Sequence, residues 1–225
     1  MRSRTPLALA LLAALAIGAA PQPPEGPHDA TAHERFTGVE KWVRVFDDPK
    51  RDEWQKPKEL VAALGLAPGS IVADLGAGTG YFERHLSQAV TPGGFVLAID
   101  TEPEMVRHLG ERAFKEQTLN VVPVLALPDE PFLPPGRVDC VLIVDTYHHI
   151  DDRLNYFRRM KGALAPGGRV AVVDFHKKPL PVGPPPPHKL AREFVLDEMK
   201  QAGWSLTDEK TFLPYHYFLI FQPAR

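Results

Sequence analysis

Residues 71–82 read I-V-A-D-L-G-A-G-T-G-Y-F, and this stretch decides the fold. An apolar, β-branched run ends at an acidic residue, turns through three glycines and enters a helical pattern. A parallel strand followed by such a loop brings backbone N–H groups and a helix N-terminus against a ligand. The glycines are spaced G-x-G-x-G, and Tyr81 stands where a dinucleotide fingerprint has its third glycine. No Lys-Ser or Lys-Thr pair follows, which excludes a phosphate-binding P-loop as well.

Outward from this stretch, apolar runs alternate with helical patterns. Such an alternation predicts an α/β fold with a parallel sheet and helices on both faces. The last two apolar runs are separated only by Pro214, a connection so short that it requires an antiparallel hairpin. The expected strands are 70–75, 95–99, 120–125, 138–144, 169–175, 204–213 and 215–221. The expected helices are 57–64, 81–90, 103–117, 152–164 (capped by Asp151-Asp152) and 189–202.

Two segments lie outside this alternation. Apolar residues recur at helical spacing over 33–46, which predicts an amphipathic helix, and 51–57 reads as irregular. Within the irregular segment, Trp54 and Gln55 are either the wall of a pocket or core residues. The proline-rich stretch Lys177–Pro187 can be neither helix nor central strand, so we expect a loop there.

The N-terminus has the pattern of a secretory signal peptide. Arg2 and Arg4 precede an apolar run, Leu7–Ile17, and small residues follow it. The run is too short to span a bilayer comfortably, so we interpret residues 1–20 as a signal peptide that directs export. The alternatives are an uncleaved membrane tether and a misplaced start codon. Residues 21–32 read as a disordered linker. We expect one domain over 33–225, with an N-terminal helical cap at 33–56.

Composition narrows the classes of partner. The chain has 225 residues with a formal net charge of −2, so no overall basic field favours nucleic acid. Cys140 is the one cysteine, which excludes an internal disulfide and a Cys-rich zinc site. It lies in the run 138–144, where we expect a buried thiol. Membrane contact is expected only through the leader, and the oligomeric state is not predicted.

The joint order of four motifs resembles the class I S-adenosylmethionine-dependent methyltransferases. They are D-L-G-A-G-T-G, an acid twenty residues after Gly80, V-D-C-V-L-I-V-D-T-Y-H-H, and L-A-P-G-G-R-V. The resemblance covers roughly residues 56–223. It implies a Rossmann-like methyltransferase fold, with a seven-stranded, mostly parallel sheet in the order 3-2-1-4-5-7-6 and an antiparallel last strand. It also implies S-adenosyl-L-methionine as cofactor and methyl transfer to a small-molecule acceptor.

The resemblance also implies which residues bind the methyl donor. The glycine loop would approach the methionine and ribose portion, and the carboxylate of Asp100 would accept hydrogen bonds from the ribose hydroxyls. At the end of the third strand the sequence departs from the family, because the first acid, Asp129, comes later than the usual adenine-binding residue. Asp129 reaches adenine only if its loop folds back. The expected donor-binding residues are Asp74, Gly76, Ala77, Gly78, Gly80, Asp100, Thr101 and Asp129.

The fourth motif is expected to face both the donor and the acceptor. His148 or His149 is suited to act as a general base near neutral pH if the acceptor must lose a proton, and the alternative is a structural His pair. Asp145 is expected to position or hydrogen-bond. No metal is expected, because the histidines lack a helical ligand spacing. Rival functions are a non-catalytic donor-binding protein, a protein or tRNA methyltransferase, and a nicotinamide-dependent oxidoreductase.

Overall fold

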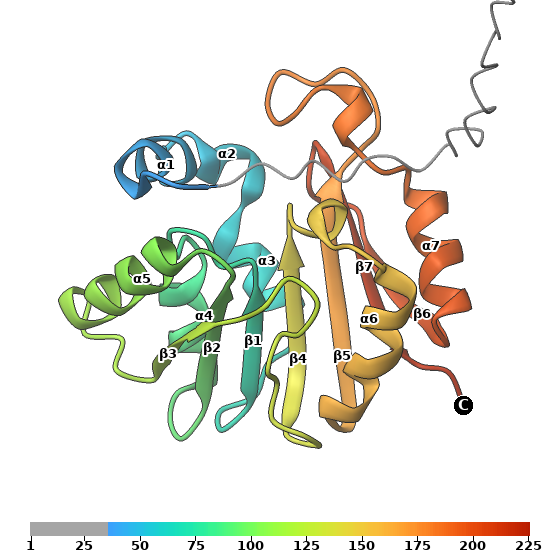
Figure 1. Ribbon diagram of the computed structural model, residues 1–225, viewed down its shortest axis with the longest axis horizontal. Coiled ribbons are helices and arrows are strands. Elements are labelled where there is room, and N and C mark those ends of the chain that lie inside the picture. The colour runs from blue at the N-terminus through green and yellow to red at the C-terminus, as the bar shows by residue number, and fades with distance from the viewer. Residues whose placement is uncertain (1–35) are drawn as a thin grey trace, which may run out of the picture.

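The computed structural model describes residues 36–225 and contains one seven-stranded sheet (Figure 1). The predicted leader, the linker and the first residues of the predicted N-terminal helix lie outside this range. The strand order is β3-β2-β1-β4-β5-β7-β6, and β7 runs antiparallel to both of its neighbours, which confirms the predicted fold and order. The strands are β1 (Ile71–Leu75), β2 (Phe95–Asp100), β3 (Val121–Leu125), β4 (Val138–Val144), β5 (Leu164–Phe175), β6 (Trp204–Lys210) and β7 (His216–Pro223).

Helices cover both faces of the sheet, because the central strands are apolar on both sides. In β4, Cys140 and Leu142 face one layer of core, while Val141 and Ile143 face the other, and all four are fully buried. The first layer contains α3 (Pro57–Ala63), α4 (Glu83–Val90) and α5 (Pro103–Lys115). The second contains α6 (Arg153–Met160) and α7 (Arg192–Gln201). The buried Cys140 thiol is confirmed as a core group.

The connection from β3 to β4, residues 126–137, contains no helix and only one isolated bridge, between Leu127 and Glu130. β3 is therefore an edge strand beside an irregular loop. Pro123 lies in the middle of this strand. Since proline has no N–H to donate, it interrupts the hydrogen-bonding edge that β3 would offer to another strand.

The N-terminal part of the domain differs from the sequence prediction. The predicted irregular segment 51–57 begins with a helix, α2 (Arg51–Gln55), so that prediction was wrong. The Arg51 guanidinium binds Gln55 one turn later and the carbonyl of Phe46 before it, contacts that a propensity pattern does not reveal. α1 (Val39–Phe46) begins later than predicted, after Gly38 in the left-handed region (φ 76°). We call α1 and α2 together the cap.

Helix ends account for the other differences. α6 ends at Met160 and is followed by a 3₁₀ turn, η2 (Lys161–Ala163), and then by β5, which starts earlier than predicted. The predicted capping of α6 is not made by Asp152, whose carboxylate instead accepts a hydrogen bond from Asn155 at 2.8 Å. Two further 3₁₀ turns are η1 (Tyr147–His149) and η3 (Pro186–His188). None of the helices within residues 36–225 combines the length and the apolar composition needed to cross a bilayer.

Gly94, just before β2, provides a test of this packing. A Cβ at this position would overlap the carbonyl oxygens of Ser70 and Val90, which are backbone atoms that cannot rotate away. We expect Gly94→Ala to lower the free energy of unfolding by about 2–4 kcal/mol, measured by urea denaturation. Gly162→Ala is the matched control, because nothing lies within 4 Å of its added methyl. An equal effect of the two substitutions would contradict the backbone contact as the cause.

Candidate functional site

The glycine loop lies at the carboxyl end of β1, at the end of the sheet that the cap covers (Figure 1). Gly76, Gly78 and Gly80 have φ values of 80°, 56° and 86°, which side chains rarely adopt. The N–H groups of Gly76 and Ala77 both donate to the carbonyl of Ile99 at 2.9 Å. This pair of bonds fixes the loop to the end of β2. A Cβ on Gly76 would overlap Thr146, so the loop also touches the end of β4.

Asp100 closes the same junction from β2. Its Oδ2 accepts a hydrogen bond from the N–H of Gly78 at 2.8 Å, and its Oδ1 accepts one from the N–H of Glu102 at 2.9 Å. Burial raises the pKa of the Asp100 carboxyl, while these two bonds oppose that rise. A carboxylate offers about four lone-pair positions, so both oxygens can each accept one further hydrogen bond. The structure thus brings Asp100 and the loop together; Thr101 follows, exposed.

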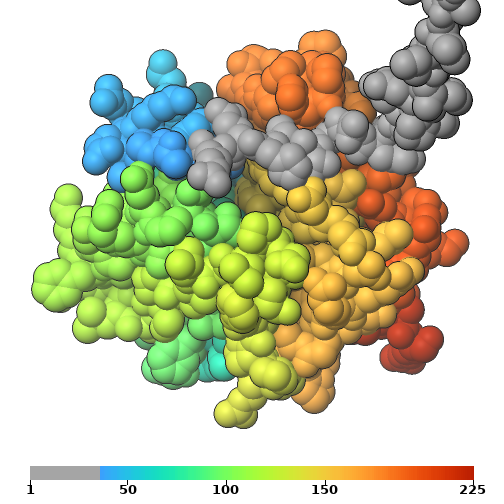
Figure 2. Space-filling model, in the orientation of Figure 1, coloured from blue at the N-terminus to red at the C-terminus, as the bar shows by residue number. Residues whose placement is uncertain are grey.

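The cap holds the loop from the other side. Thr79 donates from its hydroxyl to Asp47 at 2.8 Å, and Arg112 of α5 donates both to Asp47 at 2.9 Å and to the carbonyl of Thr79 at 2.9 Å. The ring of Phe46 lies 3.6 Å from the position that a Cβ on Gly78 would take. In Figure 2 the cap, in blue, lies directly above the green surface of α5. The glycine loop is therefore enclosed between α5 and the cap.

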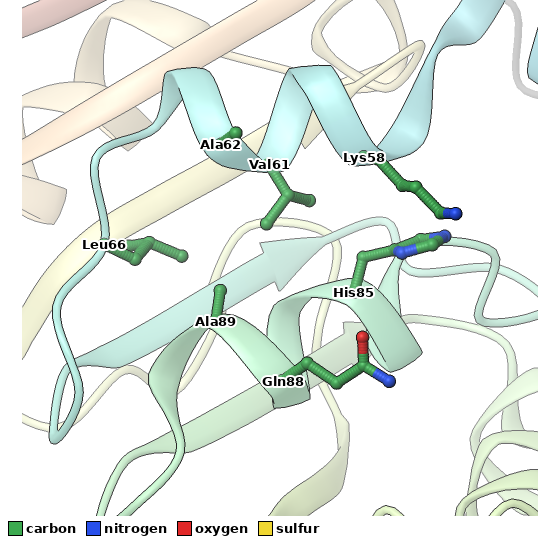
Figure 3. Close-up of a pocket in the computed structure, with 7 residues that line it drawn as sticks. All are labelled: Lys58, Val61, Ala62, Leu66, His85, Gln88 and Ala89. Atoms are coloured by element: carbon green, nitrogen blue, oxygen red, sulfur yellow. The ribbon is translucent and has the colours of Figure 1, made fainter.

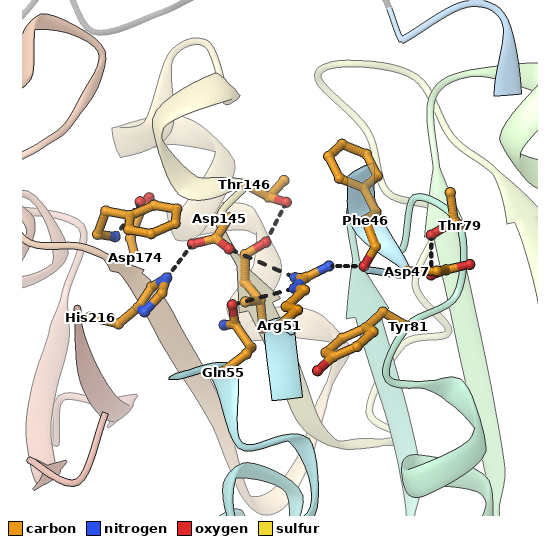
Figure 4. A network of polar contacts seen from close by, with 12 residues as sticks. Phe46, Asp47, Arg51, Gln55, Thr79, Tyr81, Asp145, Thr146, Asp174 and His216 are labelled. Carbon is orange, nitrogen blue, oxygen red and sulfur yellow. Dashed lines mark hydrogen bonds and ion pairs between the residues drawn. The ribbon is translucent and has the colours of Figure 1, made fainter. Parts of the chain in front are cut away.

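Arg51 of α2 links the loop to the end of β4, and the sequence analysis did not identify it (Figure 4). Its guanidinium donates to the carbonyl of Phe46 at 2.9 Å, lies 3.8 Å from the carboxylate of Asp145 and stacks 4.1 Å from the ring centre of Tyr81. Burial lowers the pKa of Arg51, although Asp145 opposes this effect. An arginine stays charged in proteins, so Arg51 is a cation beside the loop with only 13% of its side chain exposed.

Asp145 and His216 form the first of two Asp–His pairs. Asp145 ends β4 with φ 53°, a backbone strain typical of functional positions. His216 Nε2 donates to Asp145 Oδ1 at 2.9 Å. Burial would raise the pKa of Asp145, but His216 and Arg51 outweigh it and the pKa is lowered, so Asp145 is ionised. Trp54 stacks on His216 with ring centres 5.6 Å apart, which makes Trp54 a wall of this site.

His148 and Asp174 form the second pair. His148 Nδ1 donates to Asp174 Oδ2 at 2.8 Å, and both side chains are buried. Burial is the largest single influence and lowers the pKa of His148, but the charge and hydrogen bond of Asp174, together with the charge of Asp145, outweigh it, so the net shift is upward. His149 takes a different position: its ring meets that of Phe36 edge-on, with centres 5.6 Å apart. The two histidine rings still touch, with centres 4.1 Å apart, but only His148 pairs with Asp174.

Asp129 lies on the loop between β3 and β4, where its carbonyl accepts a hydrogen bond from Arg159 of α6 at 2.6 Å. It lines a pocket together with Tyr156 and Met160, also of α6. Its role in adenine binding stays a prediction. Within residues 36–225, no three His, Cys, Asp or Glu side chains are grouped so as to hold a metal ion.

A second pocket opens between α3 and α4, where Lys58 lies beside His85 (Figure 3). None of the predicted site residues lines it. Nor does the polar network around Arg51 extend into it (Figure 4). The predicted glycine loop, Asp100 and Asp145 therefore lie by the cap, whereas Asp129 lies in the pocket beside α6.

Sequence comparison places this arrangement among known proteins. Residues 73–170 match the family model described as a methyltransferase domain. The chain is 29% identical over 180 residues to phosphoethanolamine N-methyltransferase 1 of Zea mays, which covers 79% of this chain and 34% of that protein. It is 33% identical over 115 residues to the ubiquinone/menaquinone biosynthesis C-methyltransferase of Pasteurella multocida, covering 50% of this chain and 42% of that one. The chain thus spans about a third to two fifths of the length of these relatives.

Structural comparison covers more of the chain. A solved S-adenosylmethionine-dependent methyltransferase from Aquifex aeolicus superposes with a TM-score of 0.77 at 27% identity, over 82% of this chain and 97% of that one. The glycine loop bound to Asp100, the confirmed strand order and these matches lead to one assignment. Residues 73–170 match a methyltransferase domain, and the chain has the fold of the class I S-adenosylmethionine-dependent methyltransferases.

Proposed function

We propose that this protein transfers the methyl group of S-adenosylmethionine to a small-molecule acceptor. The observation that carries the proposal is the bond between Asp100 and Gly78, which sets a carboxylate directly against the glycine loop. When bound, the donor supplies a methyl group activated on a positively charged sulfur. The chain's own residues then have to hold the two ends of the donor and exclude water.

The residues around the loop fit such a donor. Asp100 has acceptor positions for the two ribose hydroxyls. Arg51 is a partly buried cation suited to the carboxylate of the donor's methionine portion, since a guanidinium binds carboxylates through paired N–H donors. Gln55, hydrogen-bonded to Arg51, keeps a buried amide nitrogen with no partner. Buried polar groups are normally satisfied, so this nitrogen is a further candidate contact for a ligand.

The acceptor side lies next to the loop, at the ends of β4 and β5. Trp54, Phe175 and His216 pack there as a group of rings, and the Asp145 carboxylate borders them. A small molecule with an apolar body and one or two polar groups suits such a wall. The names of the two curated relatives also point to small molecules, phosphoethanolamine in one and ubiquinone or menaquinone precursors in the other.

Methyl transfer needs an aligned nucleophile more than it needs acid–base chemistry. Where the acceptor has to lose a proton, His148 is the residue we assign as general base. Asp174 holds its Nδ1–H at 2.8 Å, which leaves Nε2 as the nitrogen that can take a proton. His149 and Asp145 are then positioning residues, one against Phe36 and the other beside His216.

Two measurements on the purified chain test the function itself. Calorimetry should show binding of S-adenosylmethionine and no binding of NAD, which separates methyltransferases from oxidoreductases. Transfer of radiolabelled methyl groups should then be found with at least one member of a panel of phosphoethanolamine, catechols and hydroquinones. Donor binding without transfer to any of these, or to proteins or tRNA, would favour a non-catalytic donor-binding protein instead.

We also propose that the protein is exported through residues 1–20. The support is the sequence pattern of that segment alone. Fractionation of cells expressing the full chain, with N-terminal sequencing of the product, tests this. A cytoplasmic product that starts at Met1 would overturn export.

Asp100→Ala should weaken binding of S-adenosylmethionine about 10- to 100-fold. The substitution leaves the N–H of Gly78 without its acceptor and removes the acceptor for the ribose hydroxyls. Asp139→Ala is the matched control: Asp139 also accepts a backbone N–H, from Ile71 at 2.8 Å, but at the opposite end of β1. Calorimetric affinities compare the two. Unchanged affinity in Asp100→Ala would remove Asp100 from the donor site.

Arg51→Met should weaken donor binding about tenfold or more, since the substitution keeps the length of the side chain and removes the cation. Arg44→Met, on the exposed side of α1, should leave the affinity unchanged. A donor analogue that lacks the carboxylate provides the check. If Arg51→Met weakens binding of the analogue as much as binding of the donor, Arg51 does not bind the carboxylate.

His148→Gln should lower turnover with little change in donor affinity. In the wild type the base must be neutral, and the pKa of His148 is raised above its usual value of 6.5. The rate should therefore rise with pH through a midpoint above 6.5 and then level off. The measurement is a pH–rate profile with any acceptor found in the panel. A profile that keeps the same midpoint in His148→Gln would assign the base elsewhere.

A further inference from the structure

A pair of carboxyl groups lies beneath the glycine loop, and only one of them was singled out from the sequence. Asp74 stands in β1 just before the loop, and Glu83 is the first residue of α4 just after it. Their exposed fractions are 2% and 4%. Glu83 Oε2 lies 3.3 Å from the position of a Cβ on Gly80, so the pair supports the loop from inside. The two side chains lie close enough for each to shift the pKa of the other.

The carboxyl groups of Asp74 and Glu83 cannot both be ionised in this arrangement. No N–H or O–H of another residue reaches Asp74 Oδ2 or either carboxyl oxygen of Glu83. A hydrogen bond between two carboxyl groups needs a proton on one of them. Two ionised carboxylates in contact, both out of water, would be strongly unfavourable, and such pairs keep one proton. Burial raises the pKa of both groups, and the negative charge of Asp74 raises that of Glu83 further.

The surrounding cations do not neutralise the pair. Arg51 faces Asp74 but is engaged by Asp145, and Arg112 faces Glu83 but is bound by Asp47 and Glu116. Asp100 of β2 adds a further negative charge, and the Cys140 thiol of β4, also near Asp74, is neutral because burial raises its pKa to about 12. The loop therefore lies over a site of excess negative charge that a proton offsets.

We propose that Asp74 and Glu83 share a proton in the donor-free protein and release it when S-adenosylmethionine binds, so that Glu83 favours the cationic donor over its uncharged product. The inference rests on the proposed function for the identity of the donor. The donor carries a sulfonium charge and a net charge of +1, whereas adenosylhomocysteine lacks the sulfonium. On binding, the O–H bond of the shared proton breaks, the electron pair stays on the carboxylate, and the proton passes to the buffer.

The sign of the pH dependence follows from linkage. Because the donor binds preferentially to the doubly ionised pair, its affinity rises with pH, by up to about tenfold per pH unit for one released proton. Glu83→Gln removes the exchangeable proton and keeps a hydrogen bond, since the amide N–H can donate to Asp74 as the protonated carboxyl does. This variant therefore resembles the donor-free, singly protonated state at every pH.

Calorimetry of S-adenosylmethionine binding in buffers of different ionisation enthalpy counts the released protons. At pH 7 the wild type should release between a half and one proton per donor bound, and fewer with adenosylhomocysteine. Glu83→Gln should still bind the donor, but with no proton release, with an affinity that changes less than about twofold between pH 6.5 and 8.5, and with a reduced preference for donor over product. Glu111→Gln, an exposed acid on α5, is the control and should behave as the wild type.

The outcomes separate the two proposals. Absence of donor binding in the wild type would overturn the proposed function. Binding without proton release in the wild type, or equal release in Glu83→Gln, would overturn the shared proton and leave the function standing. Circular dichroism of each variant establishes that it is folded, and Asp74→Asn, which should also abolish the release, provides a second test.

Discussion

The hydrogen bond from the N–H of Gly78 to Asp100 ties together the two strands on which the site is built. The carbonyl of Ile99 holds the same two strands together, because it accepts hydrogen bonds from two successive N–H groups of the loop. The loop can follow this path only because three glycines take positive φ values. Everything else at the site is arranged around that fixed turn: Thr146 packs against Gly76 from β4, Phe46 covers Gly78 from the cap, and Glu83 lies beneath Gly80.

The sequence predicts the parts of the site that are local. The alternation of apolar runs and helices determines the sheet, and the glycine loop and Asp100 are recognisable because they follow strands directly. Arg51 and His216 could not be found in this way. Each lies far along the chain from its partner Asp145, and they meet only because α2 and β7 reach the same edge of the sheet. Glu83 has the sequence position of an ordinary first-turn acid of a helix, and only its burial distinguishes it.

The two Asp–His pairs differ because neighbouring residues of a strand point to opposite faces. Asp174 points to the face covered by α6 and α7, where it meets His148. Phe175, the next residue, points to the other face, where it packs on His216 and Trp54. The imidazole assigned to proton transfer therefore lies on one face of the end of β5, and the rings that shape the acceptor side lie on the other. A change in the ring wall can alter which acceptor fits without moving the imidazole assigned to proton transfer.

One short helix covers both halves of this centre. α2 has five residues, and from it Arg51 reaches the glycine loop while Trp54 covers His216. A helix of that length has almost no stability of its own and is held by its side-chain contacts. Arg51 and Trp54 leave the same turn of backbone, so α2 covers the nucleoside side and the acceptor side as one unit. Any displacement of this turn would uncover both sides together.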